Sequence, residues 1–192
     1  MENELPKRKR LRMQNFDYNT PRAYFITICT HNKKCTLSNI VGAIHESPET
    51  VNTIYNPSEI VGAIHESPEI KLTSRGIIVD NIINAVPERF NAIVDRYVIM
   101  PNHIHIVIIL TDIEKMRAIH ESPLQSRSDI SKIIGYIKMN ASKEIHNKYP
   151  DEIVWQRGFY DHVIRNQHDY ENIVKYIYEN PMRWYYDELY TE

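Results

Sequence analysis

Residues 100–110 read MPNHIHIVIIL and combine a turn with a strand. Pro101-Asn102 is typical of a tight connection, and the apolar, β-branched run after it predicts a strand over 103–111. The preceding run, 93–100, predicts a partner strand on the other side of the turn. Residues i and i+2 of a strand point to the same face. His103 and His105 therefore project together, and Ile104 points into the core.

The histidine pair has two readings. Two imidazoles that converge from one strand can supply two ligands to a divalent metal. The same spacing also describes two histidines that simply lie on a sheet face. The pattern alone leaves both readings open.

The rest of the chain supplies the other elements of an α+β fold. Residues 23–30 are rich in β-branched and aromatic side chains and predict a first strand. The remaining elements are predicted from periodicity, caps and breakers: a helix over 74–90, a helix over 128–148 capped by Ser128, a turn and strand over 154–165, and a helix over 170–180 capped by Asn166 or Asp169. The order is strand, helix, two strands, helix, strand, helix. It predicts a ferredoxin-like antiparallel sheet with helices packed on one face.

The last helix adds candidate chemistry. Tyr176 and Asn180 are four residues apart and share one helix face, whereas Ile173 and Ile177 lie on another face that suits the core. Tyr176 could be a nucleophile, and the amide oxygen of Asn180 could complete a metal site. Because the chain has 13 tyrosines, packing is the competing interpretation of Tyr176.

Length, composition and charge set limits on the function. The 192 residues suffice for one domain, and the hydrophobic (42%) and charged (25%) fractions are ordinary for a globular protein. No apolar run approaches the ~20 residues of a membrane span, and the charged N-terminus lacks the apolar segment of a secretory signal. Two cysteines without a CxxC pair predict neither a disulfide scaffold nor a structural zinc. We expect a protein of the reducing cytoplasm.

A basic arm precedes the predicted domain. The net charge is -2, but residues 40–70 hold five glutamates and no Lys or Arg, which leaves +3 on the remainder. Residues 1–21 include a cluster that can contact DNA phosphates or remain a solvated tail, namely Lys7, Arg8, Lys9, Arg10 and Arg12. We assign 1–21 as this arm and 22–192 as the domain.

Repeats interrupt that domain at two places. IVGAIHESPE occupies 40–49 and again 60–69, and AIHESP recurs at 118–123. Copies that are near-identical, polar and irregularly spaced do not resemble stacked structural repeats. We therefore predict exposed loop insertions at about 40–70 and 112–127, and we discount the repeat histidines, His45, His65 and His120, as metal ligands.

Four segments together resemble a known family: RKRLRMQNFDYNTPRAYFITICTHNKK at 8–34, VIMPNHIHIVI at 98–108, WQRGFYDHVIRN at 155–166 and KYIYENPMRW at 175–184. They resemble the REP-associated tyrosine transposases of bacteria, which belong to the single-tyrosine HUH class and act on single-stranded DNA. The resemblance implies that His103 and His105 bind Mg²⁺ or Mn²⁺, that Tyr176 is the nucleophile, and that Asn180 can be a third ligand. The two insertions depart from the family pattern.

The resemblance also implies a reaction. Such an enzyme cleaves and rejoins single-stranded DNA at palindromic, REP-like elements through a 5′-phosphotyrosine intermediate. The sequence leaves the oligomeric state open, with a homodimer as one alternative. Arg157 and Arg165, in the third segment, are candidate contacts for single-stranded or hairpin DNA. Two alternatives remain: a decayed relative that binds DNA hairpins without cutting, and a metal-dependent phosphoesterase that uses water and would survive Tyr176→Phe.

Overall fold

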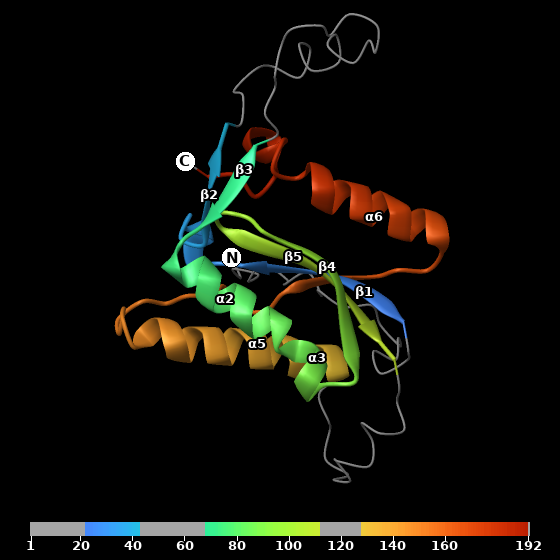
Figure 1. Ribbon diagram of the computed structural model, residues 1–192, viewed down its shortest axis with the longest axis horizontal. Coiled ribbons are helices and arrows are strands. Elements are labelled where there is room, and N and C mark those ends of the chain that lie inside the picture. Colours follow the sequence, from blue (N-terminus) through green and yellow to red (C-terminus); the bar gives the residue numbers. More distant parts are fainter. Residues whose placement is uncertain (1–21, 43–67, 112–127, 192) are drawn as a thin grey trace, which may run out of the picture.

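A four-stranded antiparallel sheet forms the centre of the protein (Figure 1). The computed structural model describes residues 22–42, 68–111 and 128–191. The strand order is β4-β5-β1-β6, with bounds β1 Ala23–Cys29, β4 Ala92–Ile99, β5 His103–Leu110 and β6 Tyr160–Val163. The predicted α+β class and ferredoxin-like layout are confirmed, and the central pair β1 and β5 runs in register from Ala23↔Ile109 to Cys29↔His103.

Helices cover both faces of this sheet. The helices α2 (Ser74–Asn84), α3 (Val86–Arg89) and α5 (Asp129–His146) lie on one side, and α6 (Gln167–Glu179) lies on the other (Figure 1). The expectation that all helices pack on one face is therefore wrong for α6. The reason is visible in β5, where residues of both faces are buried. Each face then needs a cover to keep its apolar side chains from water.

The larger core lies under α2 and α5. Ile104, Ile106 and Ile108 of β5 are fully buried there. All six positions predicted for the buried stripe of α5 are indeed buried: Ile130, Ile133, Ile134, Ile137, Ala141 and Ile145. Ser128 caps this helix by accepting a hydrogen bond from the backbone N–H of Ser131, as expected. The helical period of the sequence therefore correctly predicts which residues of α5 pack against the sheet.

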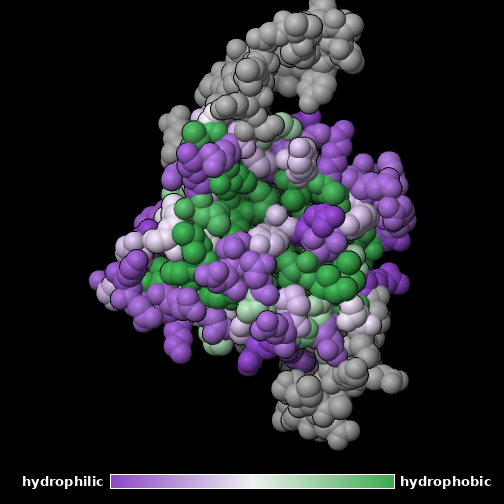
Figure 2. Space-filling model, in the orientation of Figure 1, coloured by the Kyte–Doolittle hydropathy of each residue, from purple (hydrophilic) through white to green (hydrophobic). Residues whose placement is uncertain are grey.

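A smaller core lies under α6. Val107 of β5 packs there with Ile173 and Ile177 of α6 and with Trp184 of a short 3₁₀ helix, Trp184–Tyr186. Asn166 caps α6 through a bond from the N–H of Asp169, so the helix begins at Gln167, earlier than expected. On the face seen in Figure 2, apolar side chains form patches between polar ones.

The predicted helix over 74–90 is divided. It breaks at Ala85, and Pro87 lies in the first turn of the short α3, a position where proline loses no helical hydrogen bond. Thr73 caps α2 by accepting bonds from two backbone N–H groups. Gly76 lies against the backbone of Leu37, where an added Cβ would be 2.1 Å from the carbonyl oxygen. This approach requires glycine.

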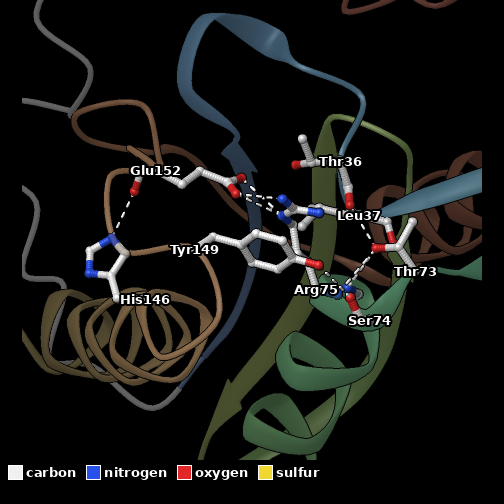
Figure 3. A network of polar contacts seen from close by, with 9 residues as sticks. Thr36, Leu37, Thr73, Ser74, Arg75, His146, Tyr149 and Glu152 are labelled. Atoms are coloured by element: carbon white, nitrogen blue, oxygen red, sulfur yellow. Dashed lines mark hydrogen bonds and ion pairs between the residues drawn. The ribbon is translucent and has the colours of Figure 1, made fainter.

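A polar cluster ties α2 to the segment after α5 (Figure 3). The guanidinium of Arg75 donates to both carboxylate oxygens of Glu152, at 2.7 to 3.0 Å, and lies 3.6 Å from the ring centroid of Tyr149. The imidazole Nε2 of His146 lies 2.7 Å from the backbone oxygen of Glu152. Bidentate geometry of this kind fixes orientation, so the cluster aligns the two helices of the larger core.

A second, two-stranded sheet corrects one prediction. β2 (Ser38–Val41) and β3 (Glu69–Leu72) pair antiparallel. Ile40↔Ile70 and Val41↔Glu69 are in register, so the ends of the expected 40–70 loop are strand instead. The rest of that insertion, the stretch 112–127 and the arm 1–21 lie outside the described residues. Among the helices that the structure describes, none is long and apolar enough to cross a membrane.

Candidate metal and nucleophile site

The two histidines of β5 lie together beneath α6. Their ring centroids are 4.4 Å apart, and both point to the face opposite Ile104, as the strand period predicts. Both are buried, with 0% of His103 and 3% of His105 exposed. The site is therefore a recess between β5 and α6, within the smaller core, rather than an open sheet surface.

Hydrogen bonds set the orientation of His103. Its Nδ1 lies 2.8 Å from Oδ1 of Asn102. The Asn102 amide nitrogen donates to the carbonyl oxygens of Leu189 (2.7 Å) and Lys33 (3.2 Å), which leaves Oδ1 as the acceptor. His103 then donates from Nδ1, and its Nε2 carries a lone pair. That Nε2 is buried, and none of the residues that the structure describes forms a hydrogen bond with it.

His105 lies between β1 and α6. Its Nδ1 is 2.9 Å from the hydroxyl of Thr27, its register partner on β1. Its Nε2 is 3.2 Å from the phenol oxygen of Tyr176. Phe25 stacks on the imidazole at a centroid distance of 5.1 Å. These contacts fix the ring so that Nε2 faces the predicted nucleophile.

Tyr176 and Asn180 share the face of α6 that borders this recess. Tyr176 is 43% exposed, and Asn180 is buried. The Asn180 amide nitrogen donates to Oδ2 of Asp187 at 2.7 Å, whereas its Oδ1 is buried and has no hydrogen-bond partner within 22–42, 68–111 and 128–191. The structure thus brings His103, His105, Tyr176 and Asn180 together, as the sequence analysis predicts.

Asp187 completes the cluster and was not predicted. It follows the 3₁₀ helix Trp184–Tyr186, and its Oδ1 accepts a bond from the backbone N–H of Leu189 at 2.6 Å. Ligand atoms of His103, His105 and Asp187 lie within 4.8 Å of one another. No motif or helical period points to Asp187, because it reaches the site through the turn that follows α6. The only hint in the sequence is a carboxylate seven positions after Asn180.

This donor set fits a divalent cation. It offers two imidazole nitrogens, an amide oxygen and a carboxylate oxygen, a mixed set suited to Mn²⁺ or a similar ion. Two of the candidate ligand atoms, His103 Nε2 and Asn180 Oδ1, are buried and have no hydrogen-bond partner among the described residues. Buried polar atoms rarely stay unsatisfied, and a cation would satisfy both.

Burial shapes the protonation states of the site. It lowers the pKa of His103 to about 4, although the negative charge of Asp187 opposes the effect. Burial and the neighbouring His103 also hold the pKa of His105 well below its usual value. Both imidazoles are therefore neutral at pH 7, the state that binds metal. Burial and Asp187 raise the pKa of Tyr176 to about 12, so its hydroxyl is protonated.

A groove of about 740 Å³ opens onto these side chains. Tyr176, His105 and Asp187 line it, together with residues of β1, β6 and the C-terminal segment, including Phe25, Thr27, Lys33, Tyr160, Arg183 and Glu188. The predicted DNA contacts Arg157 and Arg165 are exposed, and neither lines the groove. Arg157 lines a small adjoining pocket that shares Tyr160 with it.

The antiparallel α+β sheet, with a histidine pair on a central strand and a tyrosine on the covering helix, agrees with the family resemblance of the sequence motifs. The family model described as "Transposase IS200 like" matches residues 70–180, more than half of the chain. The chain belongs to this family of enzymes that act on DNA. The matched range includes His103, His105, Tyr176 and Asn180, and it excludes Lys33 and Asp187.

Individual relatives agree with this assignment. An uncharacterized protein of Haemophilus influenzae is 30% identical over 96% of this chain and 94% of its own length. A second protein of that organism, assigned as a REP-associated tyrosine transposase, is 31% identical over 47% of this chain and 50% of its own length. A REP-associated tyrosine transposase solved with a REP hairpin has a TM-score of 0.52 at 18% identity, over 92% of this chain and 77% of that one. The resemblance drawn from the motifs is confirmed.

Proposed function

We propose that this protein cleaves and rejoins single-stranded DNA at palindromic elements, with Tyr176 as the nucleophile. The observation that carries the proposal is the position of the Tyr176 hydroxyl, 3.2 Å from His105 Nε2 at the edge of the groove. The likeness to a transposase solved with a REP hairpin supports hairpin DNA as the substrate class. The pairing of an exposed tyrosine with a buried histidine pair favours nucleophilic catalysis over a packing role.

A divalent cation is the cofactor in this proposal. His103 and His105 would hold it, with Asn180 and Asp187 as the oxygen ligands. When bound, Mg²⁺ or Mn²⁺ supplies positive charge that stabilises the negative charge on the phosphate oxygens. The side chains do the rest: Thr27 and Asn102 hold the two imidazoles in place, and α6 presents the phenol to the groove.

The proposed step exchanges one phosphodiester bond for another. The Tyr176 oxygen attacks the phosphorus, the Tyr–O–P bond forms, and the bond from phosphorus to the 3′ oxygen breaks. The 3′ oxygen leaves with its electron pair and takes a proton from water. The phenol, whose oxygen is 3.5 Å from Oδ2 of Asp187, loses its proton to solvent water, and this balances the proton that the 3′ oxygen takes up. Attack by a 3′-OH on the phosphotyrosine reverses the step, so rejoining needs no ATP.

Covalent adduct formation tests the proposal. The full chain is incubated with Mn²⁺ and a 5′-labelled single-stranded oligonucleotide that carries a hairpin, or with the same strand labelled at its 3′ end. We expect a denaturation-resistant adduct with the 3′-labelled strand, abolished in Tyr176→Phe. Tyr178→Phe is the matched control, because Tyr178 lies on the same helix, is 76% exposed and does not line the groove.

Each alternative gives a different result. Cleavage by Tyr176→Phe without an adduct would indicate a phosphoesterase that uses water. Hairpin binding by the wild-type protein without any cleavage would indicate a DNA-binding protein that has lost its activity. Either result would contradict the proposed function.

A further inference from the structure

Lys33 lies at the groove in an unusual backbone conformation. It ends the 3₁₀ turn His31–Lys33, which follows β1 after one residue, Thr30, and it lines the groove together with Tyr176 and His105. Asn32 and Lys33 have φ values of 53° and 52°. Asparagine tolerates this left-handed region, whereas lysine rarely adopts it. Strained backbone of this kind persists only where its surroundings hold it in place, and it clusters at functional sites.

The surroundings do hold this turn. The carbonyl oxygen of Lys33 accepts hydrogen bonds from Asn102 Nδ2 (3.2 Å) and from the hydroxyl of Thr191 (2.8 Å). The hydroxyl of Thr30 donates to the carbonyl oxygens of Lys34 and Asn102. Asn102 is the residue whose side chain also orients His103. The position of Lys33 is therefore fixed relative to the candidate metal ligands.

The ammonium group of Lys33 is also available to bind an anion. Within the described residues its ammonium group makes one hydrogen bond, to the backbone oxygen of Glu188 at 3.3 Å, and that oxygen carries no net charge. Arg183 also lines the groove, but its guanidinium already pairs with the carboxylate of Glu179 at 3.3 Å. Lys175 pairs with the same carboxylate. Lys33 thus has donors left for an anion that enters the groove.

We propose that Lys33 binds a backbone phosphate of the DNA strand in the groove and thereby positions that strand against Tyr176. This inference rests on the proposed function. A strand that brings one phosphate to Tyr176 must place neighbouring phosphates along the same groove. An ammonium group in a fixed position is a suitable partner for one of them. The contact is independent of base identity, so it sets the register of the strand rather than its sequence.

Matched variants test the proposal. Lys33→Gln and Lys33→Met remove the charge, and Lys33→Arg keeps it. Lys34→Gln is the control, because Lys34 is the next residue, is exposed and does not line the groove. Circular dichroism and thermal midpoints establish that each variant is folded, and fluorescence anisotropy with a labelled single-stranded hairpin oligonucleotide measures affinity as a function of salt.

We expect both uncharged variants to bind about tenfold more weakly at 0.1 M salt and to lose about 0.7 from the slope of log affinity against log salt. Lys33→Arg should recover most of the affinity, and Lys34→Gln should retain the full slope. Replacing single phosphates of the oligonucleotide with uncharged methylphosphonates locates the contact. At one position the replacement should weaken the wild type and leave Lys33→Gln unchanged.

The outcomes separate the two proposals. Wild-type adduct formation together with Lys33→Gln affinity and slope equal to those of Lys34→Gln would overturn the role of Lys33 alone. A methylphosphonate scan with equal losses for wild type and Lys33→Gln at every position would do the same. A wild-type protein that neither binds the oligonucleotide nor forms an adduct would overturn the proposed function, and the role of Lys33 with it.

Discussion

One buried side chain, that of Asn102, connects three parts of the site. Its Oδ1 lies next to His103 Nδ1, and its amide nitrogen donates to the carbonyl oxygens of Lys33 and Leu189. It therefore sets the tautomer of one candidate ligand, the turn that carries the candidate phosphate contact, and the path of the C-terminal segment. Residues that support a ligand in this way tune metal affinity without touching the ion.

Asn102→Ala should accordingly lower both stability and metal affinity. The substitution removes the partner of the Leu189 carbonyl oxygen and of the His103 ring N–H, and one of the two hydrogen bonds to the Lys33 carbonyl oxygen. We expect a loss of about 2–4 kcal/mol in the free energy of unfolding. Mn²⁺ should bind at least tenfold more weakly. Urea denaturation and a Mn²⁺ titration measure the two effects. Asn172→Ala, at an exposed position of α6, is the control, and equal results for both variants would contradict this role.

Acid should destabilise the protein through the buried histidines. In the unfolded chain His103 titrates near 6.5, whereas burial lowers its pKa to about 4 in the folded protein. Between these values the unfolded chain binds a proton that the folded protein does not, so the free energy of unfolding falls as the pH falls from 6.5 to 4. The loss due to His103 is about 3 kcal/mol.

Comparing wild type with His103→Gln isolates this contribution. Urea unfolding at pH 7, 5.5 and 4.5 should show a shallower loss of stability in the variant, because glutamine does not titrate. All other titrating groups are common to both proteins. Parallel curves for the two proteins would show that His103 keeps an ordinary pKa.

The sequence predicts some residues of the site and not others. His103 and His105 follow from the strand period, and Tyr176 and Asn180 follow from the helical period. Asp187, Lys33 and the role of Asn102 could not be predicted, because irregular turns bring them to the site and no periodicity describes a turn. Burial of the histidines does not follow from the sequence either, because the expected layout puts all helices on the other face of the sheet.

At the scale of elements, local patterns predict type and extent better than placement. The buried stripe of α5 and the pairing of β4 with β5 follow from periodicity and from the Pro101-Asn102 turn. Which face of the sheet α6 covers depends on tertiary packing. Both faces of β5 are buried, and α6 covers the face that α2 and α5 do not. β2 and β3 were missed because each has only four residues. Both also overlap the repeated segment that was interpreted as a loop.

Two helical glycines provide a matched test of packing between elements. In α2, Gly76→Ala would place Cβ at 2.1 Å from the Leu37 carbonyl oxygen. We therefore expect a loss of at least about 2 kcal/mol in the free energy of unfolding. In α5, a Cβ at Gly135 meets no atom within 4 Å, and Gly135→Ala should stabilise the protein by about 0.5–1 kcal/mol. Thermal or urea unfolding of both variants checks the opposite signs. Equal effects would show that the contact with Leu37 is not tight in solution.

At the scale of the whole molecule, one chain holds the complete candidate site. His105 of the sheet and Tyr176 of α6 lie 3.2 Å apart within the same chain. If this arrangement is the active one, a mixture of His105→Ala and Tyr176→Phe proteins should form no adduct. A dimer that exchanges α6 between subunits would rebuild one intact site from that mixture.

The mixing experiment therefore distinguishes a site within one chain from a site shared between two. Denaturing and refolding the two variants together ensures that subunits can exchange, and a wild-type sample treated in the same way is the control. Recovery of up to about one quarter of the wild-type adduct, the yield of one intact site per mixed dimer in a random mixture, would show that α6 acts on a partner subunit. A homodimer, which the sequence leaves open, would then have a catalytic role.

The two-sided burial of β5 has a consequence for how this protein can vary. A substitution at one position of the strand alters either the larger core or the recess beneath α6, so the two sides can change independently. A one-residue insertion or deletion inside the strand moves every later side chain to the opposite face. Between His103 and His105 such a change would put the two imidazoles on opposite faces, and further along the strand it would place isoleucines under α6. Variation in length is thus incompatible with this strand, whereas variation in composition can retune the site while the larger core stays as it is.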